Sequence, residues 1–436
     1  MIGALLLVGA AAGSVAAGEV AGRLIASPEP GWPQWRGPRR DGICDEKGLL
    51  QSWPEGGPTR LWTASGLGRG YSSPVISGER MFLTGDVGAE LHVFALDLEG
   101  KALWRAKNGQ AWRKNFRGAR ASCCYSNGYV YHMNALGRVA CFDAATGKEE
   151  WAVNVCERFG GRPIFWGLSE CLLVDGPRVV VTPGGTKALM AALDKKTGET
   201  AWASEPLMLD LTTKFGGAKL PQPRRVADQA GYASPILLEL SGRRHIVSCS
   251  LRHTYGVDAD TGKLLWTHPM PTRWEALVMT PVLWRDCVFV TGPDGKGGVL
   301  LRIRDEGQKV SVEQVWTSDL DTLQGGDVAV GDRLYGSWYR HFDGWGCVDL
   351  RTGKTLYRTK ELAMGSAVWA DGRLYALSQR GEMALLKPTP QGFEFAGRFR
   401  LVEQQRKDVW PHPVILDGRL YLRYHDKLHC YDIKAK

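Results

Sequence analysis

The sequence predicts an eight-bladed β-propeller, an all-β ring of four-stranded antiparallel sheets. The prediction starts from a phrase that recurs at spacings of roughly 40 to 60 residues, which indicates a repeat architecture. Its clearest copies are CFDAATGKEEW at 141–151, ALDKKTGETAW at 192–202 and GVDADTGKLLW at 256–266. A second phrase recurs upstream, as in AVWADGRLY at 367–375 and PVILDGRLY at 413–421. It combines an apolar run, an Asp-Gly turn and a run that ends in Tyr.

The first phrase predicts a strand, a tight turn and a second strand. The Asp carboxylate is expected to accept hydrogen bonds from backbone N–H groups two or three residues later. The Gly that follows Thr supplies the positive φ that the turn needs. The terminal Trp offers a flat apolar surface that can pack between neighbouring sheets. Together with the upstream hairpin, each unit makes four short strands, which is one propeller blade.

The residues that close outer strands and the inner hairpins each number eight. The residues that close an outer strand are Trp62, Trp104, Trp151, Trp202, Trp266, Trp316, Tyr357 and Phe399. The inner hairpins start near Ser73, Cys124, Cys171, Ser234, Pro281, Asp327, Ala367 and Pro413. Trp62 precedes every hairpin, and the last hairpin has no outer strand after it. We therefore expect Leu61-Trp62 to supply the outer strand of the last blade, so that residues 59–436 form one closed ring without exposed sheet edges.

The N-terminal region precedes the ring. Residues 1–17 contain an apolar run of small residues that ends in Val15-Ala16-Ala17, which is typical of a cleavable signal peptide. Residues 18–58 are then a leader strap. No later segment is apolar enough to span a membrane, so a periplasmic or secreted protein, present as a monomer, is expected.

The loops that open around the axis on one face are the expected ligand site, because ligands bind in concavities of this kind. The binding candidates in these loops are Arg120, Arg252, His253, Arg340, His341 and His412. With a formal net charge of +9, two interpretations stay open. The loops form either a solvated basic rim or an electropositive funnel for an anionic ligand such as a polycarboxylate or an acidic glycan. A nucleic acid is not expected as a partner of an exported protein.

Three further features depart from the repeat. Trp166 and Glu170 lie in WGLSE, just before an inner strand; they form either a floor for a planar ligand or ordinary ring packing. Cys123-Cys124 stands where other inner strands begin with Ser-Pro. The pair either closes a strained vicinal disulfide or remains as thiols. The histidines lack metal-ligand spacing, so no metal site is predicted, and Glu170 is the acidic candidate for such a role.

The repeated phrase, the eightfold count and the export signal resemble the quinoprotein, or PQQ-repeat, propeller superfamily, in which the phrase is the tryptophan-docking motif. The leader WPQWRGPRRDG at 32–42 is similar to that of a PQQ-like propeller group common in planctomycetes. The resemblance implies two function classes, because a fold does not fix a function. One is a non-enzymatic binding or scaffold propeller, as in the outer-membrane protein assembly machine. The other is an alcohol or sugar dehydrogenase that uses pyrroloquinoline quinone (PQQ) and calcium.

For the enzyme class, the resemblance implies roles for particular residues. Cys123-Cys124 match the vicinal disulfide that lies over the quinone, Trp166 is a candidate for its floor, and Asp327 is a candidate base in a suitable loop. No motif anchors the calcium ligands, and the long inserted loops of many such enzymes are absent. We therefore favour a scaffold that binds an anionic ligand, a glycan or a protein partner on the funnel face, and keep the dehydrogenase as the alternative.

Overall fold

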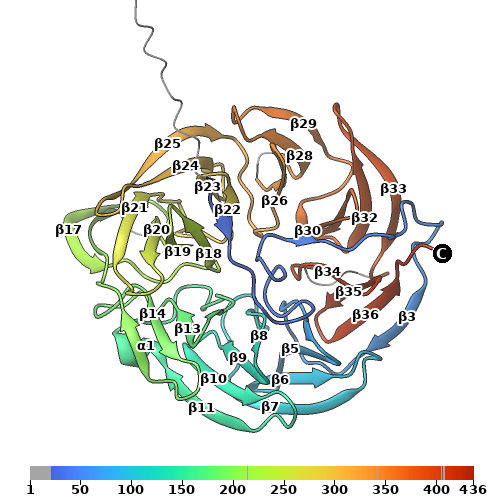
Figure 1. Ribbon diagram of the computed structural model, residues 1–436, viewed down its shortest axis with the longest axis horizontal. Coiled ribbons are helices and arrows are strands. Elements are labelled where there is room, and N and C mark those ends of the chain that lie inside the picture. Colours follow the sequence, from blue (N-terminus) through green and yellow to red (C-terminus); the bar gives the residue numbers. More distant parts are fainter. Residues whose placement is uncertain (1–20, 214, 341, 404, 406–407) are drawn as a thin grey trace, which may run out of the picture.

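Eight four-stranded antiparallel sheets surround a central axis in the computed structural model (Figure 1). It describes residues 21–436 except 214, 341, 404 and 406–407. The predicted fold class is therefore confirmed. The signal peptide expected at residues 1–17 lies outside the described residues.

Seven blades are each built from four consecutive strands, with the innermost strand first. The first is β4–β7 (Val75–Ser77, Arg80–Val87, Glu90–Leu96, Ala102–Gln110) and the second is β8–β11 (Cys124–Ser126, Tyr129–Met133, Arg138–Asp143, Glu149–Asn154). The third is β12–β15 (Leu173–Asp175, Arg178–Val181, Ala191–Asp194, Thr200–Ala203) and the fourth is β18–β21 (Ile236–Leu240, Arg243–Cys249, His253–Asp258, Leu264–Pro269). The fifth is β22–β25 (Val282–Trp284, Cys287–Gly292, Gly297–Asp305, Val310–Ser318). The sixth is β26–β29 (Val328–Val330, Arg333–Trp338, Gly344–Asp349, Thr355–Thr359) and the seventh is β30–β33 (Gly365–Ala370, Arg373–Ser378, Glu382–Pro388, Phe393–Arg400).

The last blade closes the ring with strands from both ends of the chain. It contains β34–β36 (Val414–Leu416, Arg419–Tyr424, Lys427–Asp432) and, as its outer strand, β3 (Arg60–Ala64). The antiparallel pair of β3 and β36 places Trp62 opposite Cys430. The closure expected from the sequence at Leu61-Trp62 is therefore confirmed.

The repeated phrase builds the turn and also a contact between blades. Asp143 Oδ1 accepts hydrogen bonds from the backbone N–H groups of Ala145 and Thr146, at 3.1 and 2.8 Å. Trp104 of the preceding blade donates from Nε1 to the carbonyl of Ala144 at 3.1 Å. A Cβ atom on Gly147 would lie 2.5 Å from the Trp104 ring. The turn therefore needs glycine both for its φ of 74° and for the ring that packs on it.

Most closing rings pair with a small residue, whereas Trp316 pairs with Leu300 and Phe399 with Met383. Cys141 pairs with Trp151, Ala192 with Trp202 and Cys430 with Trp62. All ten cysteines are free and buried, and Cys141, Cys347 and Cys430 are core residues as expected.

The leader crosses the centre of the ring (blue in Figure 1). It adds β1 (Arg23–Leu24) antiparallel to β18, and β2 (Ile43–Cys44) parallel to β30. Between these strands, Trp32 pairs with Ile76 on β4, and the Pro33 carbonyl accepts from the backbone N–H of Tyr125 on β8. One leader segment therefore joins the inner strands of several blades.

Two elements lie outside the blades. The hairpin β16–β17 (Met208–Thr213, Lys219–Ala227) forms a separate two-stranded sheet between the third and fourth blades. The short helix α1 (Val155–Phe159) begins after Asn154, whose side chain caps it. No helix in the described part of the chain is long and apolar enough to cross a membrane.

Candidate functional site

The leader fills the middle of the ring with buried side chains. Trp32, Arg36 and Arg40 are 2–3% exposed. Arg36 Nη1 donates to the carbonyl of Gly325 at 2.8 Å, and Arg40 Nη1 donates to the carbonyl of Leu172 at 3.0 Å. Buried guanidinium groups are stable only when their donors are paired, and these two bind backbone carbonyls at the starts of inner strands.

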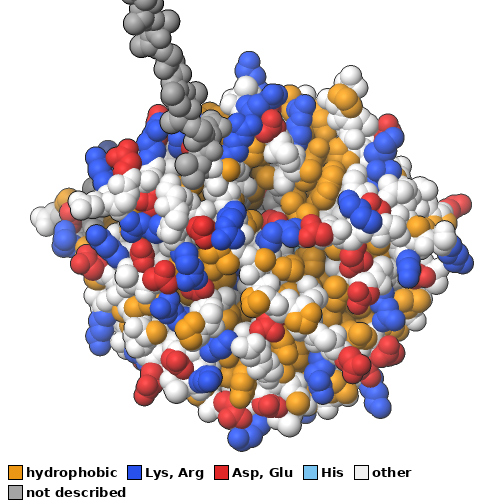
Figure 2. Space-filling model, viewed as in Figure 1, with side chains coloured by type: hydrophobic (Ala, Val, Ile, Leu, Met, Phe, Trp, Pro, Cys, Tyr) orange, Lys and Arg blue, Asp and Glu red, His pale blue; other side chains and the backbone are white. Residues whose placement is uncertain are grey.

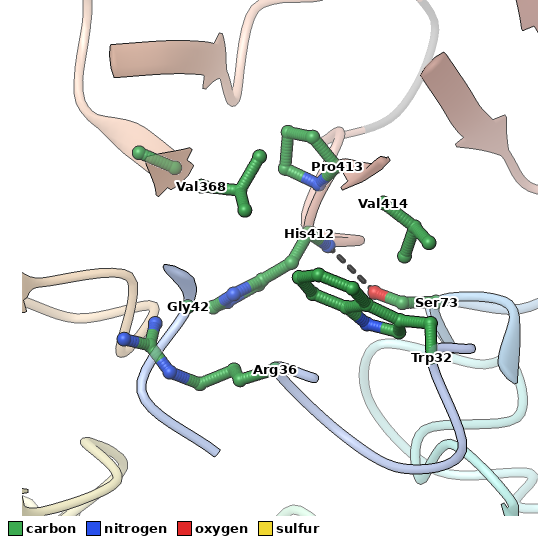
Figure 3. A pocket seen from close by; sticks show the side chains of 9 residues that line it. Trp32, Arg36, Gly42, Ser73, Val368, His412, Pro413 and Val414 are labelled. Atoms are coloured by element: carbon green, nitrogen blue, oxygen red, sulfur yellow. Dashed lines mark hydrogen bonds between the residues drawn. The ribbon is translucent and has the colours of Figure 1, made fainter. Parts of the chain in front are cut away.

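A small cavity remains beside the leader (Figure 3). Its lining includes Trp32, Arg36, Ser73 and His412. The volume is about 10 Å³, which is room for one water molecule. A three-ring quinone does not fit in this cavity.

His412 is a packed, neutral side chain at this cavity. Its ring lies 4.2 Å from that of Trp35, and its Nε2 lies 3.0 Å from the carbonyl oxygen of Gln324. The backbone N–H of His412 donates to Ser73 Oγ at 2.8 Å (Figure 3). Burial lowers the pKa of His412 to about 3, so it carries no charge at neutral pH.

Asp327 lies at the start of β26, beneath the leader. It is 1% exposed and accepts from Thr322 Oγ1 at 2.8 and 3.0 Å. Its backbone carbonyl accepts from Arg36. Burial raises the pKa of Asp327 to about 7, which suits a general base, but its described neighbours hold it within the packing of the blade.

Trp166 and Glu170 have different neighbours. Glu170 is 2% exposed and accepts from the backbone N–H of Thr182 at 2.9 Å. Burial raises its pKa to about 8. Trp166 is half-buried, and its ring lies 5.7 Å from Tyr232. The carboxyl therefore belongs to the third blade, whereas the ring belongs to a surface cluster.

Cys123 and Cys124 are free thiols in different surroundings. Cys123 packs between the first two blades with Val75, Phe82 and Val130. Cys124 begins β8 and lies near Arg40 of the leader. Burial raises the pKa of Cys124 to about 12, so its thiol stays protonated. The vicinal disulfide implied by the resemblance is not formed in this structure.

Two of the three described arginine candidates in the basic loops are paired with carboxylates. Arg252 pairs with Glu275, and Arg340 Nε donates to Asp294 Oδ1 at 3.0 Å. Arg120 donates to the backbone carbonyls of its own loop. Figure 2 likewise shows Lys and Arg interspersed with Asp and Glu around the rim of the face that it draws. These pairs favour the solvated basic rim over an electropositive funnel.

His253 is oriented by a buried carboxylate. Its Nδ1 lies 2.9 Å from Asp228 Oδ2, and Ser250 Oγ donates to the same oxygen at 2.5 Å. Asp228 is completely buried. His341, the remaining predicted candidate, lies outside the described residues.

The structure also gathers Trp166 with four aromatic side chains that the sequence interpretation did not single out. We define the aromatic patch as Phe165, Trp166, Phe215, Tyr232 and Trp274. Phe165 and Phe215 stack at 4.6 Å, and Phe215 lies 5.3 Å from Trp274. The patch combines the α1–β12 loop, the β16–β17 turn, the β17–β18 loop and the β21–β22 loop. The sequence signal that could have predicted the β16–β17 hairpin is the Gly216-Gly217 pair, which lies between two runs of alternating apolar and polar residues.

The described residues do not by themselves supply a calcium ligand set. Nowhere in the described ranges do three or more His, Cys, Asp or Glu side chains gather to hold a metal ion. Cys123, Trp166 and Asp327 have separate neighbours, as described above. We therefore derive no reaction step through a quinone or a calcium ion.

A family model described as outer membrane protein assembly factor BamB, a PQQ-type repeat model, matches residues 89–342. The chain belongs to this family. The BamB family match covers the second to fifth blades completely, together with parts of the first and sixth. The PQQ-like propeller expected from the sequence is thereby confirmed.

Other known proteins are similar over different lengths. A 1-butanol dehydrogenase (quinone) from Thauera butanivorans is 28% identical over 172 residues, which are 37% of this chain and 25% of that protein. The chain thus spans about a quarter of this curated relative.

Two solved structures share the fold. BamB from Moraxella catarrhalis has a TM-score of 0.59 at 15% identity and covers 87% of this chain and 98% of its own. A quinohemoprotein alcohol dehydrogenase from Comamonas testosteroni has a TM-score of 0.60 at 12% identity and covers 94% of this chain and 82% of its own. At these identities the likeness shows the fold alone.

Proposed function

We propose that this chain is an exported, non-enzymatic binding propeller that docks a protein partner on the aromatic patch. A signal peptide at residues 1–17 would direct it to the periplasm or the exterior. The family description as an assembly factor supports a role in binding other proteins. The leader supports it as well, because its side chains occupy the middle of the ring.

One observation carries the proposal: large rings are exposed together on one face. Phe165 is 55% exposed and Phe215 is 36% exposed, although the two rings stack on each other. Arg273 lies over the Trp274 ring at 5.0 Å. Aromatic residues and Arg are enriched at the energetic centres of protein interfaces, and exposed apolar clusters mark interaction sites.

A small anionic ligand is less well supported. The candidates Arg120, Arg252 and Arg340 are each bonded to carbonyl or carboxylate oxygens of the same face. A ligand anion would have to compete with these internal partners.

Site-specific photo-crosslinking tests the proposal. A photoreactive benzoylphenylalanine replaces Phe165 in the producing cell. The control places it at Leu103, which is 45% exposed on outer strand β7. We expect a discrete protein adduct from position 165 only, which disappears when Phe215→Ser is added. No adduct at 165, or the same adduct from both positions, contradicts the proposal.

The second candidate function is a quinone-dependent dehydrogenase, favoured by the 28% identical segment of 1-butanol dehydrogenase. Titration of the purified protein with PQQ and calcium tests it, with quinone absorbance and dye reduction by alcohols or sugars as readouts. Binding at micromolar quinone with dye reduction would replace the scaffold proposal. An unchanged quinone spectrum would exclude the enzyme.

A further inference from the structure

The hairpin that contributes to the aromatic patch carries an excess of positive charge. Strands β16 and β17 contain Lys219, Arg224 and Arg225, but only one acidic residue, Asp210. All three cationic residues are exposed. An acidic surface on a partner is attracted to such a hairpin, because complementary charge steers two proteins together.

The carboxylates on the elements of the patch are already paired within the chain. Glu275 forms an ion pair with Arg252, and Asp210 lies 3.6 Å from Arg225. Arg162, just before Phe165 in the chain, and Arg273 are both exposed, and neither forms a salt bridge among the described residues. These two guanidinium groups are therefore open to a carboxylate from outside.

Each of the two arginines is held in place by an uncharged neighbour. Arg273 lies over the Trp274 ring at 5.0 Å, and Arg162 Nη2 donates to Gln229 Oε1 at 3.2 Å. A guanidinium stacked on a ring keeps the N–H donors in its plane free, and these donors can bind a carboxylate through two parallel hydrogen bonds. Arg273 is thus oriented for a carboxylate that no described residue of the chain supplies.

Hydrogen bonds join the loops that carry the rings. The N–H of Gly216 donates to the Arg273 carbonyl at 3.0 Å, which ties the hairpin turn to the β21–β22 loop. The N–H of Trp166 donates to the Tyr232 hydroxyl at 3.3 Å, and the N–H of Tyr232 donates to the Leu277 carbonyl at 3.0 Å. Because these contacts hold the rings and Arg273 in place, little conformational entropy remains to be lost when a partner binds.

We propose that the partner bound at the aromatic patch presents an acidic segment with an aromatic anchor. The anchor packs against Phe165 and Phe215, and carboxylates beside it bind Arg273 and Arg162. This inference rests on the proposed function and adds the chemistry of the partner. A basic partner is disfavoured, because it would meet these cations and find Glu275 and Asp210 already paired.

Titration of the full chain with matched peptides tests the proposal. The acidic probe is a labelled peptide whose central Trp is flanked on both sides by Asp and Glu. One comparison peptide has Asn and Gln in place of the acids, and the other has Ala in place of the Trp. By fluorescence anisotropy, the acidic probe should bind at least about tenfold more tightly than either comparison. Its affinity should fall as the salt concentration rises.

Variants of the chain locate the effect. Arg162→Gln combined with Arg273→Gln should weaken binding of the acidic probe about tenfold and flatten its salt dependence, without changing the affinity for the Asn and Gln peptide. Arg273→Lys keeps the charge and should lose less affinity than Arg273→Gln. Arg105→Gln changes an exposed residue on outer strand β7, and this matched control should alter neither affinity. Unchanged binding of the acidic probe in the double variant would overturn the inference.

Further outcomes separate this inference from the proposed function. A protein adduct from position 165, with an acidic probe that binds no better than the Asn and Gln peptide, would leave a protein partner but refute its acidic character. No adduct and no peptide binding would refute both. Tighter binding to vesicles of dioleoylphosphatidylglycerol and dioleoylphosphatidylcholine than to the acidic probe, lost in the double variant, would replace the protein segment with an anionic membrane surface.

Discussion

Glu170 carries a carboxyl group whose charge is set by burial. It is 2% exposed, and its oxygens accept from the N–H and the hydroxyl of Thr182 at 2.9 and 3.2 Å. Desolvation is the main cause that raises its pKa from 4.5 to about 8. Between these values the folded chain holds a proton that the unfolded chain has released. The free energy of unfolding therefore falls as pH rises through this window.

Glu170→Gln should remove this pH dependence, because the amide is neutral at every pH. Compared with the unmodified chain, we expect the variant to be more stable at about pH 8 by on the order of 1–3 kcal/mol. At about pH 5 the two should agree within about 1 kcal/mol. Urea unfolding at both pH values measures the difference. A gain that is equal at both pH values would contradict the account.

Asp143→Asn serves as the comparison, because the contribution of Asp143 to the free energy of unfolding should depend on pH in the opposite direction. Bonds from Thr146 hold the pKa of Asp143 below its usual range, so its contribution is present above its unfolded pKa and is lost as pH falls. Its substitution should lower stability near neutral pH and have no effect in strong acid.

Arg40 and Arg39 are adjacent, but their surroundings differ. Arg40 is 2% exposed and donates to the carbonyls of Leu172 and Cys171. Arg39 pairs with Asp45, which is 73% exposed at its side chain. Arg40→Met should cost about 2–5 kcal/mol, because it leaves buried carbonyls unpaired. Arg39→Met should cost less than about 1 kcal/mol. Equal losses of unfolding free energy for the two variants in chemical denaturation would show that the hydrogen bonds from Arg40 to the third blade do not account for the stabilising effect of the leader.

At the scale of an element, the Trp of one blade and the Gly of the next form a joint. Trp202 donates from Nε1 to the Ala259 carbonyl at 3.1 Å. Gly262 has φ 75°, and a Cβ there would lie 2.4 Å from the Trp202 ring. Comparable bonds join Trp62 to Leu98, Trp151 to Lys195 and Trp316 to Leu350. The recurring Trp and Gly residues therefore form contacts between blades.

Gly262→Ala should test the joint against a matched control. Its strained φ and its clash with the Trp202 ring should together cost about 2–4 kcal/mol. Gly372→Ala has nearly the same φ, 76°, but nothing lies within 4 Å of its Cβ. That control should lose only about 1 kcal/mol. Thermal unfolding measures both variants, and equal losses would mean that backbone strain alone explains the glycine.

The sequence predicts the blades well because their signals are local. The Asp, Gly and Trp of each turn contact residues nearby in the chain or at a fixed repeat distance. The pairing of Cys430 with Trp62 follows from counting rings against hairpins. In contrast, Trp166 joins Phe215 and Trp274 across three loops, and Trp410 meets Tyr71 across the closure of the ring. The sequence repeat contains no information about contacts between these loops, so the clusters become visible only in the structure.

At the scale of the whole molecule, the leader determines which surfaces remain open for binding, because it occupies the centre of the ring. Its Arg36 and Arg40 bind carbonyls at the starts of the sixth and third blades, and Trp32 pairs with the first. Side chains therefore occupy the centre of the ring. The exposed rings of the aromatic patch lie instead in the loops between blades, where the proposed protein-binding surface is found.

The closure of the ring by β3 joins the two ends of the chain in one blade. Trp62 on β3 pairs with Cys430 of the last blade and donates from Nε1 to the Leu98 carbonyl of the first blade at 3.1 Å. A chain that begins at residue 65 loses the leader as well as β3, and it leaves the β36 edge unpaired; unpaired edges promote association between chains. We expect this truncated chain to form oligomers or aggregates.

A chain that begins at residue 21 keeps β3 and is the control. It should remain a monomer and unfold at the temperature of the full chain. Light scattering after size-exclusion chromatography measures both chains. If the chain that begins at 65 stays monomeric with an unchanged midpoint, then the β3–β36 pair is dispensable. The stability of the ring would in that case come from packing between blades, because hydrophobic burial along those faces does not require a closed sheet edge.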